Sequence, residues 1–139
     1  MFSLKGKNAI VTGGGSGIGL AISTAFAKQG ACVDILEINT EAGAAAVQAI
    51  TDAGGVAAVY ECDVTNQAEV KATFDAIVAG RGRLDCLINN AGIAHVGNVL
   101  TTTEADFDRV LSVNVKGVYN CLQAGVGHMQ STGGAIVNI

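Results

Sequence analysis

The stretch Thr12-Gly13-Gly14-Gly15-Ser16-Gly17-Ile18-Gly19 decides the fold that we predict for this chain. It follows an apolar run at 8–11 and precedes a run with helical periodicity. Glycine allows a tight turn and a close backbone approach, and the N–H groups at a helix N-terminus attract an anion. The spacing matches neither G-x-G-x-x-G nor a P-loop, which needs a lysine after its last glycine. It fits Gly-x-x-x-Gly-x-Gly after a threonine, and predicts a pyrophosphate-binding turn or, alternatively, an ordinary flexible loop.

Strand-like and helix-like runs alternate along the 139 residues, without a linker or a low-complexity tract. The expected strands are 7–12, 32–38, 56–62, 84–88 and 135–139. The expected helices are 18–29, 41–53, 67–79 and a long one at 104–129. Such alternation predicts a parallel sheet with right-handed crossovers. We therefore expect one α/β domain over 1–139, a doubly wound sheet with strand order 3-2-1-4-5.

Three predicted helices carry an apolar face at helical spacing, and in the helix at 67–79 this face is Val70, Phe74, Ile77 and Val78. In the first helix this face is Ile18, Ala21, Ile22, Ala25 and Phe26. In the long helix it is Phe107, Val110, Leu111, Val115, Val118 and Leu122. Asn114 lies within the face of the long helix, so we expect its amide to be buried and paired with backbone, water or a ligand. A purely structural asparagine is the alternative.

The topology brings two polar segments together. The switch point of such a sheet lies between strands 1 and 4, and ligands bind there at the carboxyl ends of the strands. The glycine turn leaves strand 1, and Asn89-Asn90-Ala91-Gly92 leaves strand 4. Both are therefore predicted to line one crevice, where the amides of Asn89 and Asn90 brace the loop or hold a ribose.

Composition excludes several classes of partner. The formal charge of −4 argues against nucleic acid or an anionic membrane. No apolar run is as long as a membrane span, and residues 1–7 lack a signal-peptide core, so we expect a cytoplasmic location. Four cysteines without a C-x-x-C pair are interpreted as small buried residues rather than metal ligands or disulfides. The isolated His95 and His128 are assigned no chemical role.

Acidic residues end the second and third predicted strands. Glu37, 24 positions after Gly13, can accept hydrogen bonds from both hydroxyls of an adenosine ribose and would repel a 2′-phosphate. No arginine or lysine lies in the glycine turn or at 38–39, which favours NAD over NADP. A solvated acid at a strand end is the alternative. Asp63-Val64 could meet an adenine at the same sheet edge, or Asp63 could cap the next helix.

Together with these segments, Asn114-Val115-Lys116-Gly117 makes the chain resemble the short-chain dehydrogenase/reductase family, and the resemblance covers its whole length. It implies a Rossmann-type fold and an NAD-dependent oxidoreductase that transfers hydride between nicotinamide and an alcohol or carbonyl substrate. It also implies a homo-oligomer through the helix containing Asn114. The implied cofactor-binding residues are Gly13, Ser16, Gly17, Ile18, Gly19, Glu37, Asp63, Val64, Asn90, Ala91 and Gly92. Asn114 matches the catalytic-tetrad asparagine, which supports a water in the proton relay.

The chain departs from the family pattern in its reactive groups. The family uses a tyrosine with a lysine four residues later, but Tyr60 and Tyr119 are followed at that distance by Val64 and Gln123. The family's serine would come after the 135–139 strand. We therefore interpret the chain as the cofactor-binding part of such an enzyme, truncated after strand 5 and inactive alone. A non-catalytic dinucleotide-binding module and one half of a split enzyme are the alternatives.

Overall fold

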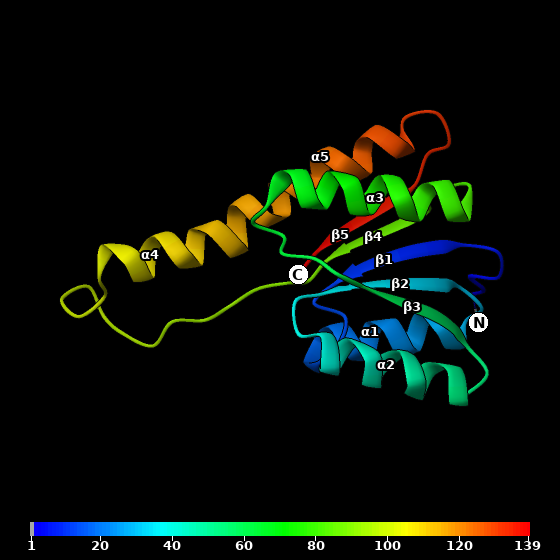
Figure 1. Ribbon diagram of the computed structural model, residues 1–139, viewed down its shortest axis with the longest axis horizontal. Coiled ribbons are helices and arrows are strands. Elements are labelled where there is room, and N and C mark those ends of the chain that lie inside the picture. The colour runs from blue at the N-terminus through cyan, green and yellow to red at the C-terminus, as the bar shows by residue number, and fades with distance from the viewer. Residues whose placement is uncertain (1) are drawn as a thin grey trace.

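The computed structural model describes residues 2–139 as a parallel sheet between two helical layers (Figure 1). The strands are β1 (Asn8–Thr12), β2 (Cys32–Glu37), β3 (Val56–Glu61), β4 (Cys86–Asn89) and β5 (Ala135–Asn138). Every neighbouring pair is parallel, and the order is β3-β2-β1-β4-β5. The predicted doubly wound sheet is confirmed, with strand bounds within two residues of those expected.

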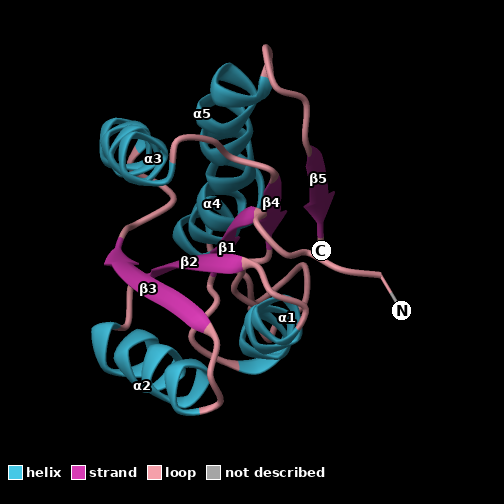
Figure 2. Cartoon of the chain, turned by 90° about the vertical axis from the view of Figure 1, so that its right-hand side faces the viewer, coloured by secondary structure: helices cyan, strands magenta, loops and turns pink. Residues whose placement is uncertain are grey.

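The helices cover both faces of the sheet. They are α1 (Gly17–Lys28), α2 (Thr40–Asp52), α3 (Gln67–Arg81), α4 (Glu104–Leu111), the π-helical segment η1 (Ser112–Gly117) and α5 (Val118–Met129). In both views α1 and α2 lie on one side, and α3 with α5 on the other (Figure 1 and Figure 2). Each side has its own apolar core, because the buried strands alternate side chains between the two faces.

The predicted long helix differs from the observed one in two respects. Its helical winding over 104–129 is interrupted by η1, and α4 extends beyond the carboxyl ends of the strands (Figure 1). Phe107 and Val115 on the expected inward face are 57% and 59% exposed, so that prediction is wrong. Asn114 is also exposed rather than buried. Periodicity groups residues on one helical face, but it does not identify what that face contacts.

The buried face of α1 also differs from the predicted one. Ala21 and Ala25 are exposed, and Ile18 is 63% exposed. Small residues, Gly19, Ser23 and Ala27, are buried instead, while Ile22 and Phe26 pack at the margin of the core. The reason is close approach: a Cβ on Gly19 would collide with the Gly13 carbonyl oxygen, and the Ser23 hydroxyl donates to the Gly14 carbonyl over 3.4 Å.

The four cysteines are free thiols. Cys62, just after β3, and Cys121, on α5, are buried in the apolar core beneath α3 and α5. Burial raises the pKa of the Cys62 thiol to about 11 and that of Cys121 to about 12. Both therefore remain protonated near neutral pH and pack as small apolar side chains.

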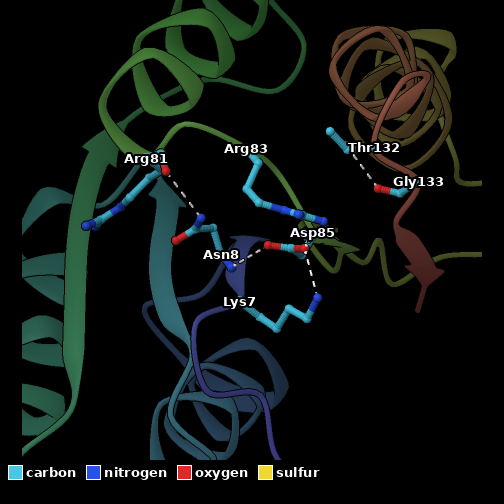
Figure 3. A network of polar contacts seen from close by, with 7 residues as sticks. All are labelled: Lys7, Asn8, Arg81, Arg83, Asp85, Thr132 and Gly133. Carbon is cyan, nitrogen blue, oxygen red and sulfur yellow. Dashed lines mark hydrogen bonds and ion pairs between the residues drawn. The ribbon is translucent and has the colours of Figure 1, made fainter.

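A buried acid joins the amino ends of β1 and β4. Asp85 is 5% exposed, and one of its oxygens accepts a hydrogen bond of 3.0 Å from the Asn8 N–H. The other lies 3.3 Å from Lys7 Nζ and 2.6 Å from Arg83 Nη2 (Figure 3). Burial alone would raise the pKa of Asp85, but these hydrogen bonds and positive charges outweigh burial and lower it.

A second buried acid ties α3 to the sheet. Asp34 on β2 has no exposed surface, and Arg81 at the end of α3 binds both of its oxygens, over 2.9 Å from Nε and 2.7 Å from Nη2. These two hydrogen bonds from one guanidinium group satisfy the Asp34 carboxylate, whose burial without a partner would cost free energy.

We predict that Asp85→Asn reduces stability by roughly 2 kcal/mol at pH 7, since it removes a charge that accepts several hydrogen bonds. Because the pKa of Asp85 is lower in the folded chain than in the unfolded chain, its ionised form stabilises the fold above the unfolded-state pKa of about 4. This stabilisation is lost as the pH falls through the folded-state pKa. Urea unfolding at pH 7 and pH 3 should therefore show a smaller acid-induced loss in Asp85→Asn than in the wild type.

The exposed Asp108 provides the matched control, because its carboxylate makes no hydrogen bond to any residue that the structure describes. Asp108→Asn should keep the wild-type acid response. An equal acid-induced loss in Asp85→Asn and the wild type would contradict the role assigned to the Asp85 network.

Candidate functional site

A cavity of about 410 Å³ lies where β1, β2, β3 and β4 end. The structure brings nearly all of the predicted cofactor-binding residues to its wall, namely Gly13, Ser16, Gly17, Ile18, Glu37, Asp63, Val64, Asn90, Ala91 and Gly92. Gly19 is buried behind the wall, where α1 packs against the glycine turn. The remaining lining residues, which sequence reasoning missed, are Leu36, Ile38, Cys62, Ile93 and Val113. They carry no polar motif, and only their positions next to strand ends could have indicated them.

The glycine turn has a backbone that other residues rarely adopt. Gly13 and Gly17 have φ angles of +62° and +51°, in the left-handed region. Ser16 is the N-cap of α1, but within residues 2–139 its side chain makes no capping hydrogen bond. The N–H groups of the first helical turn are therefore left without a partner from the cap, which suits an anionic ligand.

Thr12 and Asn90 join the glycine turn to the segment after β4. The Asn90 side-chain amide donates to the carbonyls of Thr12 and Gly13 over 3.0 and 3.2 Å. The Thr12 hydroxyl in turn accepts the backbone N–H groups of Asn90 and Ala91 over 3.0 and 2.9 Å. The two motifs thus form one wall of the cavity, and the Asn90 amide braces the loop.

Glu37 lies against the glycine turn. Its side chain is 8% exposed; one carboxylate oxygen accepts the N–H of Gly15 and the other that of Asn39, each over 3.1 Å. The alternative of a freely solvated acid at the strand end is therefore wrong. A buried carboxylate held by two backbone donors presents its remaining lone pairs in a fixed direction.

Asp63 and Val64 form the part of the wall beside β3. The Asp63 carboxylate accepts from the backbone N–H and the hydroxyl of Thr65, over 2.9 and 2.8 Å. Asn66, not Asp63, caps α3, so the helix-cap alternative for Asp63 is wrong. Val64 is 8% exposed, and its carbonyl accepts a 2.8 Å hydrogen bond from the buried Asn120.

Asn114 holds the loop that leaves β4. Its side-chain oxygen accepts the Ile93 N–H and its amide donates to the Ile93 carbonyl, both over 2.9 Å. It lies in η1, next to the cavity but outside its lining. Its amide is paired with backbone, as expected, although on an exposed surface. π-Helical segments are frequent at functional sites.

The two histidines lie outside this cavity, each beside an aspartate. His128 Nε2 is 2.8 Å from Asp75 Oδ1, and His95 Nδ1 is 3.9 Å from Asp106 Oδ1. Across the described chain, no group of three or more His, Cys, Asp or Glu side chains is placed to hold a metal. In the same part of the chain, every helix is too short or too polar to cross a membrane.

Comparison with known proteins finds one matching family model, similar sequences and similar solved structures. The family model described as short chain dehydrogenase matches residues 7–139. The chain is 42% identical to an uncharacterized oxidoreductase of Methylorubrum extorquens, covering 100% of this chain and 56% of that protein. It is 38% identical to a D-threitol dehydrogenase of Mycolicibacterium smegmatis, covering 99% and 54%. A crystal structure of NAD+-bound xylitol dehydrogenase superposes with a TM-score of 0.94 at 37% identity, over 99% and 54%. The chain thus spans about half the length of the curated relatives it matches.

We predict that Asn114→Ala accelerates hydrogen exchange at the Ile93 amide by roughly fivefold or more, because it removes a hydrogen bond worth about 1 kcal/mol. Lys116→Ala, an exposed change in the same π-helical segment, should leave that amide unchanged. Unchanged exchange in Asn114→Ala would show that the loop is held by other contacts.

Proposed function

The chain belongs to the short-chain dehydrogenase family, and we propose that it forms the NAD site of an oxidoreductase that transfers hydride between nicotinamide and an alcohol or carbonyl substrate. The observation that carries the proposal is the juxtaposition of Glu37 with the glycine turn, joined by the Gly15 N–H. A ribose acceptor and a pyrophosphate site must be neighbours to bind one dinucleotide.

The residues fit such a cofactor along the whole wall of the cavity. The turn from Gly13 to Gly19 offers helix N–H groups to the pyrophosphate, and Glu37 offers acceptors to the adenosine ribose. Asp63 and Val64 would meet the adenine, while Asn90, Ala91 and Gly92 would line the ribose of the nicotinamide half. Bound cofactor supplies or accepts the hydride.

Charge supports NAD over NADP. The Glu37 carboxylate would repel a 2′-phosphate, and the turn and residues 38–39 contain no arginine or lysine to offset it. The NAD+ in the xylitol dehydrogenase structure agrees with this assignment.

The proton relay requires groups that these 139 residues do not contain. Asn114 would support a water of the relay, but no tyrosine here has a lysine four residues later. Transfer of hydride to a carbonyl needs a proton donor tuned by a nearby cation. We therefore propose that this chain alone binds dinucleotide without turnover. A non-catalytic module and one half of a split enzyme are the rival functions.

The exposed side of α4, η1 and α5 supports a homo-oligomer. Phe107, Leu111, Val115 and Tyr119 are all more than 40% exposed, an apolar surface that a second copy could cover. We also propose a cytoplasmic location for the protein.

We predict that Glu37→Ala weakens NADH binding by roughly tenfold or more, since hydrogen bonds to a charged acceptor contribute about 1.5–3 kcal/mol. Glu37→Ser combined with Ile38→Arg should shift preference toward NADPH. Fluorescence titration with both cofactors measures each effect. Unchanged NADH affinity in Glu37→Ala would refute the ribose assignment, and an unchanged preference in the double variant would refute the charge argument.

A second prediction concerns turnover. The purified 139-residue chain should bind NADH yet oxidise none of it with a panel of ketones and aldehydes. Observed turnover would contradict the inferred need for a tyrosine and lysine, and failure to bind any dinucleotide would contradict the site. The intact mass of the protein in its natural source then distinguishes two alternatives. A mass well above that of 139 residues indicates the cofactor-binding part of a longer enzyme, and a mass equal to it indicates a separate module.

A further inference from the structure

Two glycines flank the buried side chain of Glu37. A Cβ built on Gly15 would lie 2.9 Å from Glu37 Oε2 and 3.0 Å from its Cγ. On the other side, a Cβ on Gly43 would lie 3.4 Å from Glu37 Cβ and 3.5 Å from Cγ. The acid therefore occupies a slot, defined here as the space between Gly15 and Gly43, that stays open because Gly15 lacks a side chain.

Gly43 stands out in its own helix. Its neighbours in α2 are Ala42 and the run 44–46, which are also alanines. Glycine in a helix interior is about 1 kcal/mol less favourable than alanine, so its presence in an alanine-rich helix requires a local reason. Val59 provides that reason, because its Cγ2 would be 2.5 Å from a Cβ at 43, so that glycine lets α2 lie close to β3 beside Glu37.

Gly15 differs in backbone conformation from two glycines of the turn, Gly13 and Gly17. Gly13 and Gly17 have positive φ angles, whereas Gly15 does not, so its backbone is accessible to alanine. The nearest obstacle to an alanine methyl group is the end of the Glu37 side chain, followed by the Gly43 backbone nitrogen at 3.0 Å. A flexible carboxylate moves more easily than a backbone, so alanine at this position would displace Glu37.

We propose that Gly15 is a specificity-determining residue, acting through Glu37: by leaving the slot open, it holds the carboxylate where it selects NAD over NADP. The inference rests on the proposed function, and it assigns Gly15 a role separate from pyrophosphate binding. The Gly15 N–H completes the arrangement, because it fixes the same oxygen that a side chain at position 15 would displace.

The test is a titration of NADH and NADPH against the wild type and Gly15→Ala, followed by fluorescence and by the shift in thermal unfolding. Gly15→Ala should lower NADH affinity by roughly tenfold, since NADH depends on hydrogen bonds to the carboxylate, and should leave NADPH affinity unchanged or higher, since a displaced carboxylate repels the 2′-phosphate less. Equal losses for both cofactors would overturn the inference. The matched control is Gly80→Ala on α3, where a Cβ would meet no described atom within 4 Å, and it should change neither affinity.

A double-mutant cycle tests the route of the effect. In the Glu37→Ala background, Gly15→Ala should add no further change in NADH affinity; an additive loss would overturn the inference. In the Glu37→Asp background, where the acid is one methylene shorter, Gly15→Ala should cost less NADH affinity than in the wild type, and an equal cost would also overturn it. The comparison of Glu37→Asp with the Glu37→Asp, Gly15→Ala double variant keeps the test decisive if Gly15→Ala alone fails to fold. A wild type that binds neither cofactor would refute the proposed function instead.

Discussion

The contact between the glycine turn and the end of β4 is the constraint on which the rest of the site depends. Asn90 donates to two carbonyls of the turn, Thr12 accepts two N–H groups of the 90–91 segment, and Gly19 lets α1 approach both. A Cβ at Gly19 would lie 2.5 Å from the Asn90 amide nitrogen and would collide with the Gly13 carbonyl, so this junction tolerates only glycine. Because the junction spans the switch point of the sheet, it fixes the width of the cavity and the direction of the first N–H groups of α1.

The same geometry explains what sequence could predict. Strand order and the meeting of the two motifs follow from chain alternation and from the handedness of crossovers, which depend little on individual side chains. Strand ends carry the polar motifs, so the walls of the cavity could be located from Gly13, Glu37, Asp63 and Asn90. The brace formed by Thr12 was not foreseen, because a threonine before a glycine turn has no distinctive pattern of its own.

Val70, Phe74 and Ile77 of α3 are buried as expected, but the packing faces of α1 and of 104–129 were predicted less well, for a physical reason. In α1 the strongest apolar periodicity includes Ala21 and Ala25, but the helix is drawn so close to the turn that only Gly19, Ser23 and Ala27 fit against it. In 104–129 the apolar spacing predicts one face, yet α4 runs past the sheet, and Phe107 in α4 and Val115 in η1 are exposed. The spacing of apolar residues predicts which of them share a helical face. Which element packs against that face depends on where the helix lies in the fold.

The two ends of the sheet use buried acids in opposite ways. At the amino end, Lys7 and Arg83 neutralise Asp85, and the carboxylate has three donors close by, so it contributes to stability. At the carboxyl end, the partners of Glu37 among residues 2–139 are the neutral N–H groups of Gly15 and Asn39, and the acid lines an open cavity. A carboxylate held by backbone donors, with no cationic partner among the described residues, can discriminate between ligands by charge. The difference lies in the partners rather than in the acids themselves: the backbone N–H groups of Gly15 and Asn39, instead of basic side chains, hold Glu37.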